Sequence, residues 1–290
     1  MYYKLRNTKF SKIISHVCAL VLFLGCTNSV PSFNWVETLP KPWELSEDEF
    51  ASYLPKFKEK YPDFHDRIKA INLWRVGTPY GIFKLGEEID PDPDPILRVD
   101  TSDCTVHVLT TLAFAQSDDW TDSRNNMINI HYKANENGKS IPTFKSRWHY
   151  TSDRILNHQQ TVDITSLLVP EQYLETITIE LNRKEDGSEF LDLGWSSVQN
   201  ISFIPVKNVH HMNMEKVQEV CGVAFVKRSY FSSGIMIAHE GYLIDKERLI
   251  HASSVDGKTV NVPFLEYLSN NGNSRFDGVM IYKILPDNKS

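Results

Sequence analysis

Residues 103–115 read DCTVHVLTTLAFA. This run predicts one helix over 106–115, which Asp103 and Cys104 open. A helix N-terminus carries partial positive charge and unpaired N–H groups, and both stabilise a thiolate. We therefore expect a lowered pKa for the Cys104 thiol, which would make it a nucleophile. Considered alone, Cys104 fits the alternative of a small buried core residue better, because free cysteine often has that role.

Two histidines far downstream change this balance. His239 and His251 are 12 residues apart in the stretch HEGYLIDKERLIHASS, and the polar residues between them predict a hairpin of two short strands. One imidazole would take the thiol proton, and the second would hold the first in the correct tautomer. The Cys104 sulfur should then lie within roughly 4 Å of a His239 ring nitrogen. Each histidine alone could equally be a core or strand-end residue.

The segments upstream of the cysteine helix are predicted to be helical as well. Ser46 and Glu49 form a capping-box pattern, which predicts a helix through about Lys60. A second helix is expected over 66–76, and the GTPYG sequence at 77–81 then breaks it. The N-terminal part of the fold is therefore expected to consist of helices.

The segments downstream are mostly strand-like. Alternating and β-branched residues predict strands at 127–132, 199–205, 223–226, 235–238, 242–244, 249–251, 259–262 and 279–284. Residues 173–181 are expected to begin as helix and continue as strand, and short helices are expected from Ser152 and over 264–268. Helices followed by a mostly antiparallel sheet indicate an α+β fold.

The composition is that of an ordinary globular protein. The 290 residues are 41% hydrophobic and 23% charged, which suits one large domain or two small ones. We expect a single domain over 46–287. The net charge of −6 provides no basic field, so no nucleic-acid partner is expected.

The first residues have the pattern of an export signal. Four cations precede a short apolar run over 13–24: Lys4, Arg6, Lys9 and Lys12. The run is too short to span a bilayer stably and ends at Gly25-Cys26. It resembles a bacterial lipoprotein signal peptide over 1–26, in which Cys26 is lipidated and is followed by a tether over 27–45. The alternative is an ordinary secretory signal. Both imply export, and the lipoprotein signal implies a membrane anchor facing the periplasm.

Beyond the signal, two cysteines remain, Cys104 and Cys221. A disulfide between them is possible in an oxidising compartment. We expect both thiols to be free, with Cys221 buried, because a disulfide would block the chemistry. No metal site and no cofactor are expected. The DPDPDP stretch at 90–95 indicates a solvated turn, and the other histidines lack the spacing of zinc ligands.

The motifs at Asp103, His239 and His251 resemble those of the NlpC-type papain-like cysteine peptidases and amidases, which cut bacterial cell-wall peptides. In that superfamily an Asp-Cys pair opens a core helix, and a His-x-Gly strand and a His-Ala-Ser strand follow. The resemblance implies a papain-like fold, with the nucleophile helix packed on the sheet. It also implies that Cys104 is the nucleophile, His239 the base and His251 the orienting residue. Tyr80 and Asp103 would lie at the oxyanion or substrate side.

A narrower resemblance covers nearly all of 74–285 and is to the N-acetylmuramoyl-L-alanine amidase-like branch. It rests on the motifs RWHY at 147–150, DIT at 163–165 and VPFLEYL at 262–268. It implies a substrate-side element made of Arg147, His149 and Tyr150. It further implies hydrolysis of the amide between N-acetylmuramic acid and L-alanine, in peptidoglycan or its fragments, and we expect a monomer.

Two alternatives to this function stay open. A stem-peptide endopeptidase would use the same nucleophile and base. A catalytically idle binding lipoprotein would share the fold without the reaction. The second alternative is motivated by departures from the family pattern at His107, Val223 and Glu240, where Glu240 replaces the usual valine after the base.

Overall fold

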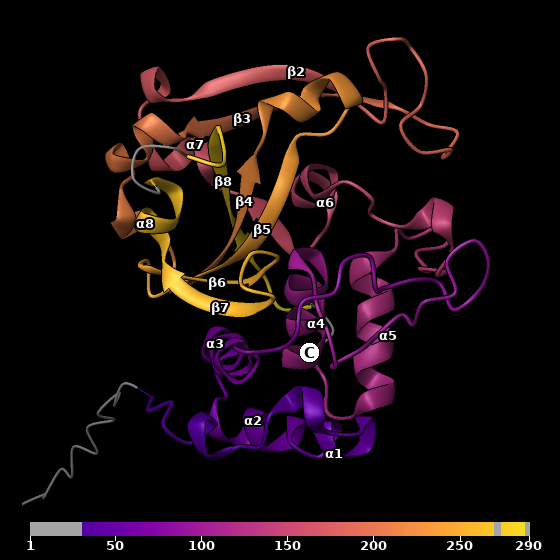
Figure 1. The fold of residues 1–290 in the computed structure, drawn as a ribbon, viewed down its shortest axis with the longest axis vertical. Helices are drawn as coiled ribbons and strands as arrows, with labels where there is room; N and C mark the ends of the chain where they lie inside the picture. Colours follow the sequence, from indigo (N-terminus) through magenta and orange to yellow (C-terminus); the bar gives the residue numbers. More distant parts are fainter. Residues whose placement is uncertain (1–30, 270–273, 288–290) are drawn as a thin grey trace, which may run out of the picture. The chain divides into compact units, whose positions relative to one another are not determined.

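Helix α4 (Cys104–Gln116) is the helix predicted from the sequence 103–115, and it starts where expected (Figure 1). The computed structural model describes residues 31–269 and 274–287. The predicted signal peptide, its Cys26 and the first residues of the predicted tether lie outside these residues. Asp103 caps α4, because its side chain accepts a hydrogen bond from the Val106 N–H group.

Three helices precede α4 along the chain and one follows it: α1 (Glu47–Ala51), α2 (Leu54–Lys60), α3 (Phe64–Trp74) and α5 (Trp120–His131). The predicted capping box is present, since Ser46 and Glu49 exchange hydrogen bonds. The prediction of one continuous helix through Lys60 is wrong, because the chain turns after Ala51 and α2 begins anew. Pro55 lacks the N–H group that a continuous helix would need there, so it fits only near a helix start.

The strand predicted over 127–132 is also wrong, because nearly all of these residues belong to α5. Asp119 caps this helix by accepting a hydrogen bond from the Asp122 N–H group. Met127 and Ile130 are three residues apart, so they share one helix face, and both are buried. The cap and the burial of this face against α4 outweigh the β propensity of the alternating sequence.

Eight strands of the described chain form an antiparallel sheet in the order β2-β3-β8-β4-β5-β6-β7, with β1 paired to β8. The strands are β1 (Thr161–Asp163), β2 (Glu175–Leu181), β3 (Ser197–Pro205), β4 (Val220–Val226), β5 (Ile237–Ile244), β6 (Arg248–Ser253), β7 (Lys258–Pro263) and β8 (Gly278–Ile284). The α+β class is confirmed. The strands predicted over 235–238 and 242–244 are one strand, β5, and the predicted hairpin is β5–β6.

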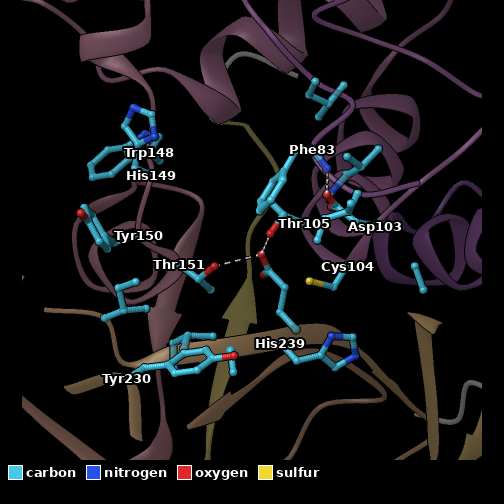
Figure 2. A pocket seen from close by; sticks show the side chains of 18 of the residues that line it. Phe83, Asp103, Cys104, Thr105, Trp148, His149, Tyr150, Thr151, Tyr230 and His239 are labelled. Atoms are coloured by element: carbon cyan, nitrogen blue, oxygen red, sulfur yellow. Dashed lines mark hydrogen bonds between the residues drawn. The ribbon is translucent and has the colours of Figure 1, made fainter. Parts of the chain in front are cut away.

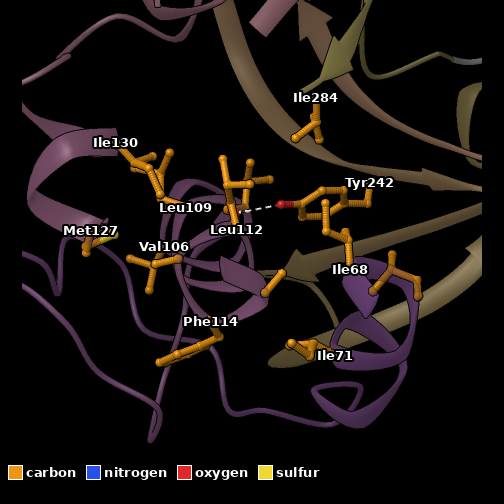
Figure 3. Packing of buried hydrophobic residues seen from close by; sticks show 14 of the residues in the cluster. Ile68, Ile71, Val106, Leu109, Leu112, Phe114, Met127, Ile130, Tyr242 and Ile284 are labelled. Carbon is orange, nitrogen blue, oxygen red and sulfur yellow. Dashed lines mark hydrogen bonds between the residues drawn. The ribbon is translucent and has the colours of Figure 1, made fainter. Parts of the chain in front are cut away.

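The two faces of the sheet bury different helices, because successive strand residues point to opposite faces. On one face Tyr242 packs against α3 and α4, and its hydroxyl donates a hydrogen bond to the Val108 carbonyl over 2.8 Å (Figure 3). On the other face Leu243 and Leu249 pack with α7 (Thr165–Leu168) and α8 (Phe264–Ser269). The β5–β6 part of the sheet is therefore covered by α3 and α4 on one face and by α7 and α8 on the other.

The remaining elements are short. They are α6 (Thr151–Asn157) and the 3₁₀ turns η1 (Val36–Thr38), η2 (Pro42–Glu44), η3 (Phe144–Ser146), η4 (Glu171–Tyr173), η5 (Val206–His211), η6 (Met214–Lys216) and η7 (Arg228–Ser233). Residues 33–45, within the predicted tether, pack on the helices: Phe33 stacks on Tyr61 at 5.1 Å between ring centroids, and Val36 is buried. Within the described residues, no helix has the length and apolarity needed to cross a membrane.

Candidate functional site

One cavity collects all the predicted catalytic and substrate-side residues (Figure 2). Its volume is about 900 Å³, and the N-termini of α4 and α6 and parts of β5 and β6 contribute to its wall. The predicted residues on this wall are Tyr80, Asp103, Cys104, Arg147, His149, Tyr150, His239 and His251. Side chains that are far apart in the sequence therefore meet at one site.

Asp103 fixes the start of helix α4, which carries Cys104. Its Oδ1 atom accepts the Val106 N–H group over 2.9 Å, and its Oδ2 atom accepts the Phe83 N–H group over 3.0 Å. Both carboxylate oxygens thus have backbone partners. Burial raises the pKa of Asp103, and these two hydrogen bonds oppose that rise. Asp103 therefore holds Cys104 in the first helical position and ties the loop of Phe83 to it.

The two histidines of the β5–β6 hairpin form a direct pair. His239 Nε2 and His251 Nδ1 are 2.8 Å apart, and the two rings are nearly perpendicular at 87°. Gly241 makes this close approach possible, because a Cβ there would lie 2.8 Å from the Ile250 carbonyl oxygen and 2.9 Å from the His251 Cβ. The His-x-Gly pattern thus has a steric cause in the packing of β5 on β6.

The hydrogen bond between the histidines restricts the tautomers that can act on a thiol. If His239 donates from Nε2 to His251, its Nδ1 atom carries a lone pair and can accept a proton. His251 then carries its own proton on Nε2, a buried atom with no hydrogen-bond partner among the described residues. In this arrangement His239 has a nitrogen that can accept a proton, and its hydrogen bond to His251 fixes its tautomer.

The electrostatic state of Cys104 differs from the one expected at a helix N-terminus. Burial raises the pKa of the Cys104 thiol to about 12, and the carboxylates of Asp103 and Glu240 add to the rise. Burial also lowers the pKa of His239 well below its ordinary value, with His251 and Arg275 adding to the effect. The expected lowered thiol pKa is therefore wrong for this state, in which thiol and imidazole are both neutral.

The Cys104 thiol and the His239 imidazole line the same cavity. Across the described residues, no hydrogen bond joins the Cys104 thiol to His239. Contacts of this kind often tighten only when substrate binds. Cys104 and Cys221, the two cysteines of the described residues, are free as expected, and Cys221 is buried.

Tyr80 is held near Cys104 by backbone pairing. Its N–H group donates to the Gly257 carbonyl over 2.9 Å, and its backbone pairs with Ser102, two residues before Cys104. Burial raises the pKa of Tyr80, and the nearby Cys104 and Asp103 raise it further. The phenol therefore stays protonated and can donate a hydrogen bond into the cavity.

Glu240 forms a buried hydrogen-bond network next to Cys104. Its side chain is 1% exposed and pairs with Arg154, which is 2% exposed. Its Oε1 atom accepts the hydroxyls of Thr105 over 3.0 Å and Thr151 over 3.1 Å, as Figure 2 shows. Its Oε2 atom accepts the Tyr282 hydroxyl over 3.2 Å. Glu240, which follows His239, is thus hydrogen-bonded to Thr105, which follows Cys104.

In the sequence Glu240 departs from the family pattern, but its partners cannot be found from the sequence. The available signal was a carboxylate within a strand of buried residues, which requires a cation and several donors. Gly222 supports the same network, because a Cβ there would lie 2.0 Å from the Tyr282 ring. The partners Arg154 and Thr151 come from α6, whose position could not be inferred from spacing.

The predicted substrate-side residues have internal partners. Arg147 donates from Nε to Glu87 over 2.7 Å and from Nη2 to Asp92 over 2.8 Å. His149 Nε2 lies 2.6 Å from the Phe144 carbonyl, and burial lowers the pKa of this histidine to about 4. The Tyr150 hydroxyl donates to Asn182 Oδ1 over 2.6 Å. These three side chains border the cavity while their polar atoms hold its wall together.

The DPDPDP loop is more than the solvated turn that was expected. Asp92 makes an ion pair with Arg147, and the Asp92 carbonyl accepts the Glu87 N–H group over 2.8 Å. The loop therefore closes one side of the cavity wall through charge pairing. In the described part of the chain, no group of three or more His, Cys, Asp or Glu side chains is placed to hold a metal ion.

Comparisons with solved structures support this fold. A Legionella pneumophila protein is 22% identical, with 82% of this chain and 94% of that chain covered and a TM-score of 0.66. An N-acetylmuramoyl-L-alanine amidase from Bacteroides uniformis is 19% identical, with 77% and 99% covered and a TM-score of 0.54. A Bacteroides fragilis protein provisionally named a xylanase is 22% identical, with 74% and 99% covered and a TM-score of 0.55. At these identities the likeness shows the fold alone.

A sequence-family comparison is more specific. None of the curated proteins compared matches this chain. The family model described as N-acetylmuramoyl-L-alanine amidase-like (AmiA-like) matches residues 71–274. The match includes Tyr80, Cys104, Arg147 and both histidines, and it spans well over half of the 290 residues. The chain therefore belongs to the N-acetylmuramoyl-L-alanine amidase-like family.

Proposed function

We propose that this protein is a cysteine-dependent amidase that cleaves the bond between N-acetylmuramic acid and L-alanine in peptidoglycan or its fragments. Family membership supports an amidase-like hydrolase of cell-wall material. The observation that carries the cysteine chemistry is the 2.8 Å pair of His239 and His251 on the wall of the cavity that Cys104 also lines. A helix-borne cysteine packed on an antiparallel sheet that carries the histidines also fits a papain-like arrangement.

In the proposed reaction His239 accepts the thiol proton of Cys104, and the sulfur attacks the amide carbonyl carbon. Burial lowers the pKa of His239, so its imidazole is neutral and available as a base. The C–N bond then breaks as His239 gives the same proton to the leaving amine. Water hydrolyses the resulting thioester, which restores the thiol and releases the acid.

The oxyanion formed by this attack needs hydrogen-bond donors beside the sulfur. The Cys104 backbone N–H group has no intrahelical acceptor and lies at the positive end of α4, whereas the Val106 N–H group is already bonded to Asp103. Tyr80 offers a second donor, because burial raises its pKa and keeps the phenol protonated. We assign oxyanion stabilisation to these two groups.

The cellular setting is proposed from the N-terminal sequence. Residues 1–26 would direct export as a lipoprotein signal peptide, and a lipid on Cys26 would anchor the protein in a membrane, facing the periplasm. The partner there would be peptidoglycan. We propose a monomer that needs no cofactor for the reaction.

Product analysis tests the proposed bond. Purified protein is incubated with soluble muropeptides, and the products are identified by mass spectrometry. Release of peptides with a free N-terminal L-alanine, together with intact muramic acid, is the expected result. Shortened stem peptides that remain on the sugar would instead identify an endopeptidase and contradict the proposed bond.

One observation favours a second candidate, a binding lipoprotein without activity. Burial raises the pKa of the Cys104 thiol to about 12, and in the described structure this thiol makes no hydrogen bond to His239. A protein of this kind would bind muropeptides and leave them uncut. Stoichiometric binding of intact muropeptide with no product after prolonged incubation would support this candidate over the amidase.

A further inference from the structure

Exposed aromatic side chains are concentrated at the candidate site. Among the phenylalanine, tyrosine and tryptophan residues that the structure describes, three are strongly exposed: Phe83 at 80%, Tyr230 at 44% and Phe190 at 41%. All three line the cavity that contains Cys104. An exposed apolar group of this size, gathered at one concave site, is typical of a ligand-binding surface.

Phe83 has the backbone of a residue that is held in place. Its φ angle of 53° lies in the left-handed region, which a bulky side chain rarely adopts. Its N–H group donates to Asp103, the residue that caps α4 and precedes Cys104. The surrounding structure therefore fixes the Phe83 backbone relative to the nucleophile, although the ring is left facing solvent.

The exposed aromatic rings of the cavity come from different segments of the chain. Figure 2 shows Phe83 in the upper part of the view and Tyr230 in the lower part, with Cys104 to the right at a height between them. The exposed Ile82 side chain borders the cavity next to Phe83 and extends its apolar surface. Phe83 is tied by its backbone to the residue before the nucleophile, whereas Tyr230 comes from η7.

We propose that the ring of Phe83 is a platform for the pyranose ring of the muramoyl group, which lies on the acyl side of the bond to be cut. This proposal rests on the proposed function. An aromatic face carries partial negative charge, so it attracts the C–H bonds that cover one face of a pyranose ring. The L-alanine side of the bond offers a methyl group and amides, which have no extended flat face.

The platform is tested by binding rather than by turnover. A Cys104→Ala background prevents cleavage, and isothermal titration calorimetry measures two ligands, N-acetylmuramoyl-L-alanine and lactoyl-L-alanine. The second ligand keeps the amide and lacks the sugar. In this background Phe83→Ala is expected to weaken the affinity for the muramoyl ligand about 10-fold, since one aromatic stack is removed. The affinity for the lactoyl ligand is expected to stay unchanged. Phe83→Trp, which keeps a flat ring, is expected to retain the affinity for the sugar ligand.

Tyr230→Ala is the matched control, because it removes another exposed aromatic ring from the wall of the same cavity. It is expected to change the affinity for the two ligands by the same factor. Phe83 is exposed, so its truncation should leave folding nearly unaffected, which thermal unfolding of the variant checks. The proposed platform would be overturned if Phe83→Ala weakened the affinity for both ligands equally. It would also be overturned if Cys104→Ala showed no measurable binding of the muramoyl ligand.

Turnover of the native protein separates this proposal from the proposed function. Cleavage of muropeptides by native protein, combined with an unchanged ratio of the two affinities in Phe83→Ala, rejects the platform and leaves the amidase standing. Selective loss of sugar binding in Phe83→Ala, combined with no cleavage by native protein, supports the platform and rejects the amidase.

Discussion

The Cys104 side of the cavity and the Arg147 side differ in how their polar atoms are satisfied. Around Arg147, the guanidinium, the His149 imidazole and the Tyr150 hydroxyl all have protein partners between 2.6 and 2.8 Å. On the other side, the Cys104 thiol makes no hydrogen bond to its proposed base, and His251 Nε2 is buried without a partner among the described residues. The bonded side chains around Arg147 hold the shape of the wall, although Glu87 Oε2 and Trp148 Nε1 beside them are also buried without a partner among the described residues. The two sides should therefore respond differently to substitution.

The largest expected effect is on stability, from the Arg147 side. Arg147→Gln leaves the buried Glu87 carboxylate without its cation, and the expected loss is about 3–5 kcal/mol in the free energy of unfolding. Urea denaturation measures it. The matched control is Arg124→Gln, whose ion pair with Glu88 is exposed at 37% and 42% and should contribute less than about 1 kcal/mol. Equal losses in the two variants would contradict the structural role of Arg147.

The next effect is on rate, from the histidine side. His251→Leu removes the acceptor that fixes the His239 tautomer, and kcat is expected to fall about 100-fold, or about 2.7 kcal/mol, with KM little changed. His149→Leu is the matched substitution on the other side and should change kcat by less than about fivefold. Steady-state kinetics on a soluble muropeptide measure both. A larger loss of kcat in His149→Leu than in His251→Leu would reverse the comparison.

The smallest expected effects are on stability and kcat, from the two threonines that bond to Glu240. Thr105 and Thr151 donate to the same Glu240 oxygen over 3.0 and 3.1 Å, so Thr105→Val and Thr151→Val should each lower stability by about 1 kcal/mol. Only Thr105 adjoins Cys104, so only Thr105→Val should also lower kcat, by about fivefold, through displacement of the thiol. Equal kcat values in the two variants would show that the network holds the fold and not the nucleophile.

Local patterns in the sequence predicted much of the fold because each depends on neighbouring residues. The capping box at Ser46 and the N-cap at Asp103 involve residues three apart, and both are present. The hairpin from His239 to His251 is likewise local. The prediction of a strand over 127–132 was wrong because an alternating pattern fits a strand and a half-buried helix equally. Contact with α4 decided between them.

The site was predicted less completely, because pairing across the fold is not encoded in spacing. The proposed reactive residues were placed in one cavity by motif and by resemblance. The Arg154 partner of Glu240 lies 86 positions away, and the Glu87 partner of Arg147 lies 60 positions away. The thiol pKa was predicted in the wrong direction, because burial and the carboxylates of Asp103 and Glu240 raise it, and burial cannot be read from a helix start alone.

Comparison of the two free thiols in the described part of the chain shows whether the Cys104 thiol is the nucleophile. Cys104→Ala and Cys221→Ala remove the same group from one protein, in the first case from the cavity and in the second from the sheet. Both variants and the native protein are incubated with purified cell wall, and released peptides are quantified by mass spectrometry. The account predicts that Cys104→Ala releases at least about 10³-fold less product than native protein, whereas Cys221→Ala stays close to native. Digestion by Cys104→Ala at the native rate would contradict it.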